Sequence, residues 1–195
     1  CGLKIDEAVK FSNLAAGVVI GKIGSATASL KEIFEYASKV NKSSSDKHIK
    51  TIEEIIPLIN DLKLRNKKIV FTNGCFDLIH AGHVSFLESA KSFGDILVLG
   101  LNSDRSVTAL KGKDRPINSQ DDRALILAAF EVVDYVVIFN ENTPYNLINS
   151  IKPHILVKGG DYTGKEIVGQ DIVDELKIVE FLDGKSSTKT IEKIL

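Results

Sequence analysis

The sequence predicts an α/β fold in which a parallel sheet of about five strands is covered by helices on both faces. From about residue 68 onward, short β-branched runs alternate with segments of helical periodicity. These runs are apolar throughout, which is typical of strands buried on both faces of a parallel sheet. Strands are expected at 68–72, 96–101, 135–139, 155–158 and 178–181, and helices at about 83–93, 103–110, 119–131, 144–151 and 187–194.

The strand ends indicate where a ligand would bind. In open parallel sheets, ligands bind beyond the carboxyl ends of the strands. Functional residues are therefore expected in the loops that follow residues 72, 101, 139, 158 and 181.

Composition and charge argue against several classes of protein. The chain has 195 residues, 44% of them hydrophobic, and 25 Lys and Arg balance 26 Asp and Glu to a net charge of −1. A general nucleic-acid binder usually carries a basic excess, so no nucleic-acid partner is expected. No apolar run approaches the roughly 18 residues of a membrane span, and no charged leader precedes an apolar stretch, so no membrane partner is expected. Cys1 and Cys75 cannot form a disulfide framework and lack zinc-ligand spacing, which favours a reducing cytoplasm.

Residues 1–40 differ in character from the rest of the chain. Small apolar residues around 14–20 predict a buried helix, followed by a glycine-rich turn and a second helix at about 30–40. About 40 residues can hardly bury a core alone, and the chain has no Met, so we expect a piece of a longer polypeptide. The polar residues 41–50 are expected to form a linker, which leaves 51–195 as the main domain.

The main domain is expected to begin with a helix at about 51–64. Thr51 followed by Glu54 is a capping box, and isoleucine and leucine recur behind it at helical spacing. Pro57 is unfavourable inside this helix and marks a position where it could kink.

The strongest chemical signal follows the first expected strand. Gly74 and Gly82 allow close approach to the main chain, and the helix that begins there offers free N–H groups to an anion. His80 and His83 are three residues apart, so both imidazoles can point at one phosphate group and donate hydrogen bonds in the transition state. The alternative is that both histidines cap the helix or satisfy carbonyl groups of the core.

Two later segments could contact a nucleotide. Residues 158–161 follow the fourth expected strand, and their paired glycines let a planar base lie close to the main chain. Ser186, Ser187 and Thr188 open the last expected helix and offer hydroxyl and amide groups to a second anion. Ordinary N-capping is the alternative for this second segment.

Several motifs are similar to those of known enzymes. The run from Asn73 to Asp77 and on to His80-Ala81-Gly82-His83 resembles the signature of the nucleotidyltransferase superfamily, which includes cytidylyltransferases and pantetheine-phosphate adenylyltransferase. Residues 51–195 resemble the adenylyltransferase domain of the bifunctional heptose-7-phosphate kinase/heptose-1-phosphate adenylyltransferases. Residues 5–29 resemble the end of their ribokinase-like kinase domain, so 1–40 would be a C-terminal remnant of such a domain. The narrower resemblance rests on Gly100 to Asp104, Leu110 to Gly112, Arg115-Pro116, Val157 to Tyr162 and Gly184 to Thr188.

The resemblance implies a Rossmann-like fold and a reaction. AMP would pass from ATP to D-glycero-β-D-manno-heptose 1-phosphate, giving ADP-heptose and pyrophosphate for the lipopolysaccharide core. Such an in-line attack on the α-phosphorus needs positioning and charge neutralisation rather than an enzyme nucleophile. Mg²⁺ is expected to arrive with ATP, bound through phosphates and water, and the sequence shows no dedicated metal cage. We also expect a homo-oligomer.

The resemblance also assigns residues to roles. His80, His83 and Lys111 would be catalytic, with Lys111 touching phosphate and Lys113 facing solvent. Cys75 would contribute a backbone contact, because a small residue at a strand end is more often packing than a nucleophile. The nucleotide would be bound by Asn73, Gly74, Cys75, Phe76, Gly82, Lys158, Gly160, Asp161, Ser186, Ser187 and Thr188, and the sugar phosphate by Asn102, Asp104, Arg115 and Arg123.

Alternatives remain for single residues and for the whole chain. Lys111 could lie in a solvated loop, Asp104 could serve as a first-turn acid, and Arg123 could form only an ion pair. Another member of the superfamily, such as a glycerol-3-phosphate cytidylyltransferase, would use the same chemistry on a different base and alcohol phosphate. A binding module with an inactive site, in which residues 1–40 form an interface, is the alternative from a different class.

Overall fold

The computed structural model describes residues 4–22, 24, 26–40, 45–160, 164 and 166–180. The chain divides into two compact units, Cys1–Ser44 and Ser45–Leu195. Each unit is described by itself below.

The first unit contains two helices, α1 (Ile5–Ile20) and α2 (Leu30–Val40). Gly17 allows them to pack closely, because a Cβ atom there would lie 2.4 Å from the ring of Tyr36. The expectation of a buried helix at 14–20 is wrong, since α1 buries none of its residues and Ile20 is 83% exposed. Two helices cover each other on one side only, which leaves apolar side chains uncovered within this unit.

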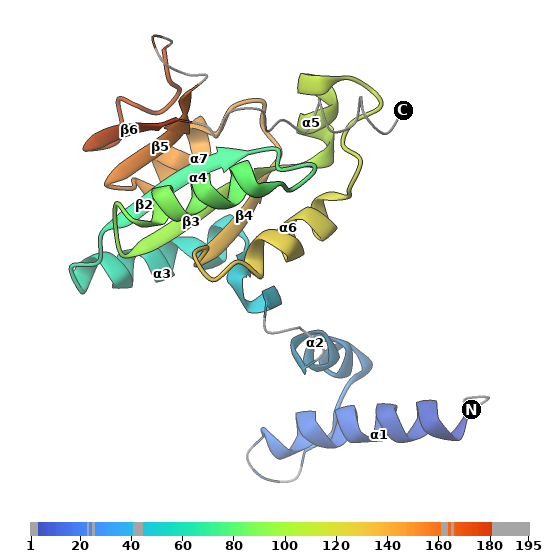
Figure 1. Cartoon of the computed structure of the whole chain (residues 1–195). Helices are drawn as coiled ribbons and strands as arrows, with labels where there is room; N and C mark the ends of the chain where they lie inside the picture. The colour runs from blue at the N-terminus through green and yellow to red at the C-terminus, as the bar shows by residue number, and fades with distance from the viewer. Residues whose placement is uncertain are drawn as a thin grey trace. The chain divides into compact units, whose positions relative to one another are not determined.

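The second unit is built on a six-stranded parallel sheet with the strand order β1-β4-β3-β2-β5-β6 (Figure 1). One strand more is present than the five expected. The strands are β1 (Ile49–Lys50), β2 (Ile69–Gly74), β3 (Ile96–Asn102), β4 (Tyr135–Phe139), β5 (Ile155–Gly159) and β6 (Glu175–Val179). The helices are η1 (Ser45–His48), α3 (Ile52–Leu64), α4 (Ala81–Lys91), α5 (Asp104–Lys111), α6 (Gln120–Ala128) and α7 (Tyr145–Ile151).

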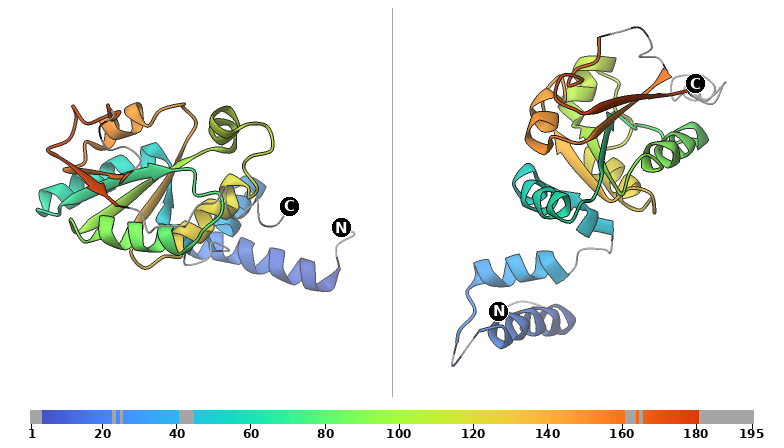
Figure 2. Two further views of the ribbon diagram at one scale, coloured as in Figure 1. Left: turned by 45° about the horizontal axis from the view of Figure 1, so that its top comes forward. Right: turned by 90° about the vertical axis from the view of Figure 1, so that its left-hand side faces the viewer.

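Helices cover both faces of the sheet, as the apolar strands predict (Figure 2). Phe86 and Leu87 of α4 and Leu127 of α6 belong to one buried cluster. Ile55 of α3 and Leu147 of α7 belong to the cluster on the opposite face. The expected α/β fold class is therefore confirmed.

The expected linker at 41–50 is too long at its C-terminal end. Residues 45–50 belong to the second unit, where they form η1 and β1. Ile49 pairs with Val136 of β4, and the Nδ1 atom of His48 lies 2.8 Å from the Asp134 carbonyl oxygen. A two-residue strand next to a polar run has too short a pattern to be found by periodicity.

Most other elements lie where the sequence places them. Thr51 and Glu54 form the expected capping box, and α3 continues through Pro57. The last strand is Glu175–Val179 rather than 178–181, because Glu175 and Lys177 interrupt the apolar pattern at this half-buried sheet edge. The helix expected at 187–194 lies outside the described residues.

The topology brings the loops after β2 and β3 together. β2 and β3 pair in parallel from Ile69 opposite Ile96 to Gly74 opposite Leu101. The loops that follow these strands therefore leave the sheet next to each other. In the part of the chain that the structure describes, no helix has the length and apolar character needed to cross a membrane.

Candidate active site at the carboxyl edge of the sheet

A cavity of about 520 Å³ lies at the carboxyl ends of the strands. It is formed by residues that follow β2, β3, β4 and β5, as expected for an open parallel sheet. The lining consists of Asn73, Gly74, Cys75, Phe76, Asp77, His83, Phe86, Asn102, Leu110, Lys111, Asn142, Thr143, Pro144, Lys158, Gly159, Glu166 and Val168.

The loop after β2 brings its backbone unusually close to an aromatic ring. A Cβ atom on Gly74 would lie 2.9 Å from the Phe76 ring, so any larger residue here would force that ring to shift. Phe76 has a φ angle of 44°, in the left-handed region that non-glycine residues rarely adopt. Its ring packs against His83, with 5.2 Å between the ring centroids. The strained loop thus supports the histidine.

The two histidines stack on each other. Their ring centroids are 3.9 Å apart and their planes differ by 17°. His80 is the N-cap residue of α4, but its side chain makes no capping hydrogen bond, so the capping alternative is not supported. His83 lines the cavity, whereas His80 does not.

His83 is suited to donate a hydrogen bond while neutral. Burial, followed by the nearby His80 and the charge of Lys111, lowers the pKa of His83 to about 4. The ring is therefore neutral near pH 7 and carries its N–H on one nitrogen. Its Nδ1 atom is buried and has no hydrogen-bond partner among the described residues.

Two lysines supply positive charge to the cavity. Lys158 is buried at the end of β5, and its ammonium group donates a hydrogen bond to the Asn73 side-chain oxygen. Lys111 is the last residue of α5 and is exposed. Because both line the cavity with His83, the site suits a ligand that carries several negative charges.

Cys75 lacks the properties of a nucleophile. Its thiol is half-buried, and burial raises its pKa despite the nearby positive charges of Lys111 and Arg123. A thiol with a raised pKa is mostly protonated near pH 7 and is a poor nucleophile. The backbone carbonyl oxygen of Cys75 accepts a hydrogen bond from Arg123.

A cytidylyltransferase-like family model matches residues 71–192, which is more than half of the chain. The chain belongs to the cytidylyltransferase-like family. The bifunctional protein HldE of Aliarcobacter butzleri is 66% identical over 192 residues, or 98% of this chain. HldE of Sulfurimonas denitrificans is 60% identical over 193 residues, or 99% of this chain. In both alignments the chain spans 40% of the length of the curated relative.

Two solved structures are similar to this cytidylyltransferase-like chain. The lipopolysaccharide core biosynthesis protein from Thermoplasma volcanium is 28% identical with a TM-score of 0.51, over 61% of this chain and 99% of that one. A pantoate-β-alanine ligase from Francisella tularensis is 18% identical with a TM-score of 0.50, over 75% of this chain and 77% of that one. The second likeness concerns the fold alone.

Three of the four residues expected to bind the sugar phosphate lie outside the cavity lining of this family member. Asn102 lines it, but Asp104, Arg115 and Arg123 do not. Arg123 is buried and donates to the Asp104 carboxylate and to two backbone carbonyl oxygens, so its ion-pair alternative is the one observed. Arg115 donates to the Asp77 carboxylate. A charge count cannot reveal these buried partners.

Asp77, within the motif after β2, has a structural role. Its buried carboxylate accepts hydrogen bonds from Arg115 and from the backbone N–H groups of Ile117 and Asn118. Burial alone would raise the pKa of Asp77, but these donors outweigh it and lower the pKa. The carboxylate therefore remains charged and fully used within the protein.

The nucleotide-binding expectations have mixed outcomes. Asn73, Gly74, Cys75, Phe76 and Lys158 line the cavity. Gly82 is buried in the first turn of α4 and Gly160 follows β5, and neither lines it. The remaining expected residues, Asp161, Ser186, Ser187 and Thr188, lie outside the described residues.

Several lining residues were not expected individually. Asn142, Thr143 and Pro144 follow β4, in one of the loops that the strand ends indicated. Phe86, Leu110, Gly159, Glu166 and Val168 complete this set. These residue types have no distinctive spacing, and the position after a strand was the one available signal.

The described residues around the cavity show how a metal ion could be held there. Across the described ranges, no group of three or more His, Cys, Asp or Glu side chains could hold a metal ion. Asp77, the buried carboxylate of the lining, already accepts three hydrogen bonds. Glu166 is the other carboxylate among the described lining residues, and the two do not make up a complete ligand set for a divalent ion.

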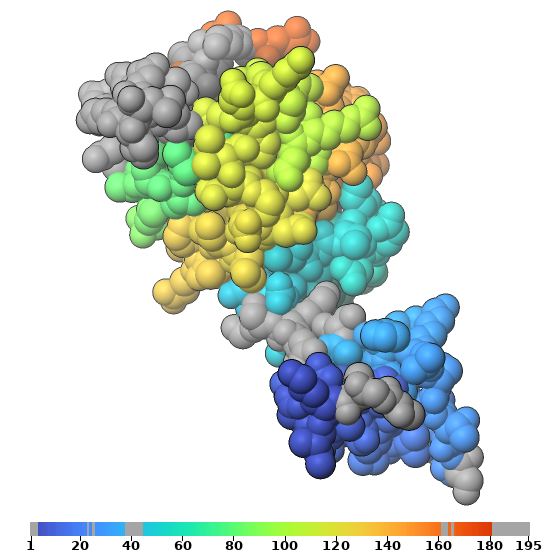
Figure 3. Space-filling model, turned by 90° about the vertical axis from the view of Figure 1, so that its right-hand side faces the viewer, coloured from blue at the N-terminus to red at the C-terminus, as the bar shows by residue number. Residues whose placement is uncertain are grey.

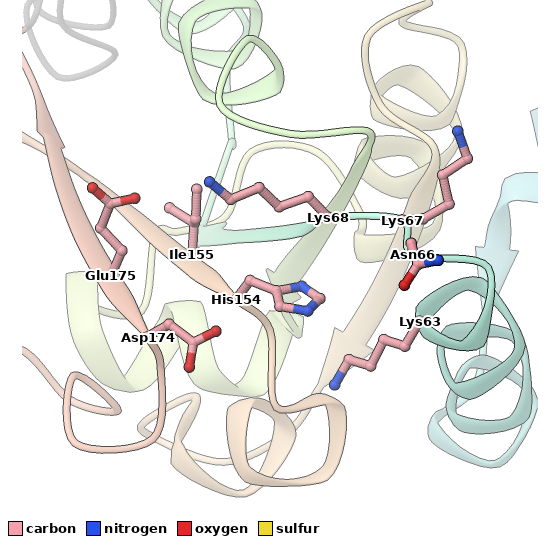
Figure 4. Close-up of a pocket in the computed structure, with 8 residues that line it drawn as sticks. All are labelled: Lys63, Asn66, Lys67, Lys68, His154, Ile155, Asp174 and Glu175. Carbon is pink, nitrogen blue, oxygen red and sulfur yellow. The ribbon is translucent and has the colours of Figure 1, made fainter.

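A second cavity of about 460 Å³ lies at the amino edge of the sheet (Figure 4). Its polar side chains form hydrogen bonds that connect helices and strands of the second unit. Lys63 donates hydrogen bonds to the carbonyl oxygens of Ile151 and Lys152 at the end of α7. His154 accepts a 2.9 Å hydrogen bond from the backbone N–H of Ile69. We attribute a structural role to these two residues.

Proposed function

We propose that this chain transfers AMP from ATP to D-glycero-β-D-manno-heptose 1-phosphate, giving ADP-heptose and pyrophosphate. The observation that carries the proposal is the cavity in which neutral His83 and the cations Lys111 and Lys158 face one space. The cytidylyltransferase-like family and the 66% identity to a bifunctional protein HldE support the choice of reaction. The likeness to a lipopolysaccharide core biosynthesis protein supports the choice of pathway.

The reaction is an in-line displacement at phosphorus. An oxygen of the sugar phosphate forms a bond to the α-phosphorus of ATP, and the bond from that phosphorus to the oxygen bridging to the β-phosphate breaks. Pyrophosphate leaves with the electron pair. No covalent enzyme intermediate is needed, which agrees with the raised pKa of the Cys75 thiol.

The side chains act through charge and hydrogen bonds. The N–H of neutral His83 donates to phosphate oxygen, where negative charge grows as the transition state forms. Lys158, held by Asn73, and Lys111, at the end of α5, reduce the repulsion between the two phosphorylated substrates. His80 supports the His83 ring by stacking on it rather than by lining the cavity.

The two substrates would occupy different loops. The nucleotide lies against the loop after β2 and the Lys158-Gly159 end of β5, where small residues permit close approach of a base. Asn102, with the newly found Asn142 and Thr143, offers amide and hydroxyl groups to the sugar phosphate.

Nucleotidyltransferases that use ATP generally need a divalent metal ion. In this proposal Mg²⁺ enters as part of the substrate, bound by the ATP phosphates and water, since the described side chains form no cage for it. The protein contributes the surrounding cations and hydrogen-bond donors.

We assign the first unit to the end of a ribokinase-like kinase domain, on the resemblance of residues 5–29. The Gly-Ala-Gly-Asp motif of that family does not occur in this chain, so it should not phosphorylate heptose 7-phosphate. Kinase turnover by a pure sample would overturn this assignment. We further propose that the enzyme is cytoplasmic, because ATP is its substrate, and that it is a homo-oligomer.

A direct assay tests the proposed reaction. The chain is incubated with ATP, Mg²⁺ and heptose 1-phosphate, and ADP-heptose and pyrophosphate are measured. A parallel reaction contains CTP and glycerol 3-phosphate, and His83→Ala serves as the inactive control. Faster turnover of the CTP pair would identify a different superfamily member, and no turnover of either pair would favour an inactive binding module.

A further inference from the structure

Arg123 joins three segments beneath the surface of the second unit. Its side chain is 0% exposed, and every contact uses a different acceptor. The guanidinium donates to the Cys75 carbonyl oxygen after β2, to the Asn118 carbonyl oxygen at 3.1 Å, and to the Asp104 carboxylate at 2.8 Å. A planar guanidinium with five N–H donors can donate to all three acceptors at once, whereas the ammonium group of a lysine has no such fixed planar geometry.

The segment before α6 is fixed to the same loop by a second set of contacts. The Asp77 carboxylate accepts from Arg115 and from the backbone N–H groups of Ile117 and Asn118, at 2.7 Å and 3.2 Å for the two backbone groups. The Asn118 side chain donates back to the Asp77 carbonyl oxygen at 2.9 Å. Residues 75–77 are therefore held at both ends, by Arg123 at Cys75 and by the segment before α6 at Asp77.

Helix α5 is attached to this network along its length. The Asp104 backbone N–H donates to the Gln120 side chain at 3.0 Å, and the Asp104 carboxylate accepts from Arg123. One turn later, the Thr108 hydroxyl donates to the Arg115 carbonyl oxygen at 2.7 Å. In Figure 3, the yellow-green and yellow atoms of α5, the segment after it and α6 lie side by side on one face.

We propose that the Asp104–Arg123 pair is a positioning device for catalysis, which sets the distance between Lys111 and His83. The pair joins α5, which ends at Lys111, to the loop that carries Phe76. Phe76 in turn packs against His83. The inference rests on the proposed function, because it assumes that Lys111 and His83 act on the same phosphates.

The arrangement explains why two charged side chains lie outside the cavity yet next to it. A buried guanidinium must be matched by acceptors, and here they come from the loop after β2, the first turn of α5 and the segment before α6. A shift of about 1 Å between reacting groups can reduce turnover about 100-fold. A rigid link between the two loops therefore has a direct effect on rate.

Asp104→Ala tests the link, because this side chain is 43% exposed and its loss leaves the Ser103 cap of α5 intact. We expect kcat to fall about tenfold or more while the KM for ATP changes by less than about threefold. Asp104→Asn, which keeps an acceptor oxygen, should recover most of the rate. Asp121→Ala, at an exposed acid in the first turn of α6, is the matched control and should leave kcat unchanged.

A double-mutant cycle with Lys111→Ala separates positioning from stability. If the pair acts by placing Lys111, Asp104→Ala should cost little further rate once Lys111 has been removed. Losses that multiply fully in the double variant would overturn the proposal. An unchanged kcat for folded Asp104→Ala, or an equal loss in Asp121→Ala, would overturn it as well.

Amide hydrogen exchange decides the question without substrate. In Asp104→Ala, residues 73–78 and α5 should both exchange faster than in the unmodified chain, while α3 keeps its protection. Faster exchange confined to α5 would contradict the link. If the unmodified chain makes no ADP-heptose, the proposed function fails, and this exchange measurement still decides whether the pair joins the two loops.

Discussion

The imidazole rings of His80 and His83 lie face to face, with their centroids 3.9 Å apart. Their spacing in the sequence predicts that both point at one phosphate, but His83 lines the cavity and His80 lies behind it. Burial and the neighbouring ring both lower the pKa of His83, so the cavity receives a neutral donor rather than two positive charges. Positive charge is supplied by lysines instead.

Removal of the His83 ring tests its role as a donor. His83→Ala should lower kcat by about 100-fold or more, because a donor aimed at transition-state charge typically contributes that much. ATP binding should weaken far less. Steady-state kinetics and an ATP titration measure the two effects, and a variant that unfolds while keeping its activity per folded molecule would show that the ring is structural.

His83 should also make stability depend on pH. Its pKa is about 4 in the folded chain and has the ordinary value of 6.5 when unfolded. Between these values the unfolded chain binds a proton that the folded chain does not, so the free energy of unfolding falls as pH drops from about 6.5 to about 4. Above about pH 6.5 the histidine is neutral in both states and does not change the free energy of unfolding. Urea unfolding at several pH values measures the slope.

His83→Gln is the control for that slope, because glutamine does not titrate. This variant should lose less stability than the unmodified chain over the same pH range. Equal losses in the two proteins would mean that other groups, such as carboxylates, cause the whole effect.

The fold was predictable where the hydrophobic periodicity of the sequence identifies each strand and helix. Apolar strands such as 135–139 were placed at their observed bounds, because burial on both faces demands continuous apolar side chains. The strand Ile49–Lys50 was missed, since two residues have no period, and it pairs with Val136 and Val137 of β4, which are far away in the sequence. The exposure of α1 was missed because a helix pattern does not reveal how many neighbours cover it.

The site was predictable where backbone geometry and the motif coincide. Asn73 to Phe76, His83, Lys111 and Lys158 come together as expected because they all follow neighbouring strands. Arg123 and Asp104 were assigned to the sugar phosphate because the sequence does not distinguish a charged residue that faces a ligand from one that faces a buried partner. That distinction requires the three-dimensional contacts.

Gly74 provides a steric test of the loop after β2. In Gly74→Ala the new Cβ would lie 2.9 Å from the Phe76 ring, which must then move from its place beside His83. We expect kcat to fall by about tenfold or more with a smaller loss of ATP affinity. Gly21→Ala is the control, because a Cβ there meets its nearest atom at 3.6 Å. Equal kinetics for Gly74→Ala and the unmodified chain would show that the ring position is unimportant.

Lys111 offers a test of charge in the cavity that is separable from folding. Its side chain is exposed at the end of α5, so Lys111→Ala should change stability by less than about 0.5 kcal/mol while turnover falls, because the ammonium acts only when the phosphates are brought together. Lys111→Arg should recover part of the rate, since a planar guanidinium does not replace a compact ammonium. Lys113→Ala is the control, because Lys113 is exposed and does not line the cavity. If Lys113→Ala reduced turnover as much as Lys111→Ala, the lysine that faces the phosphates would have been assigned to the wrong position of this loop.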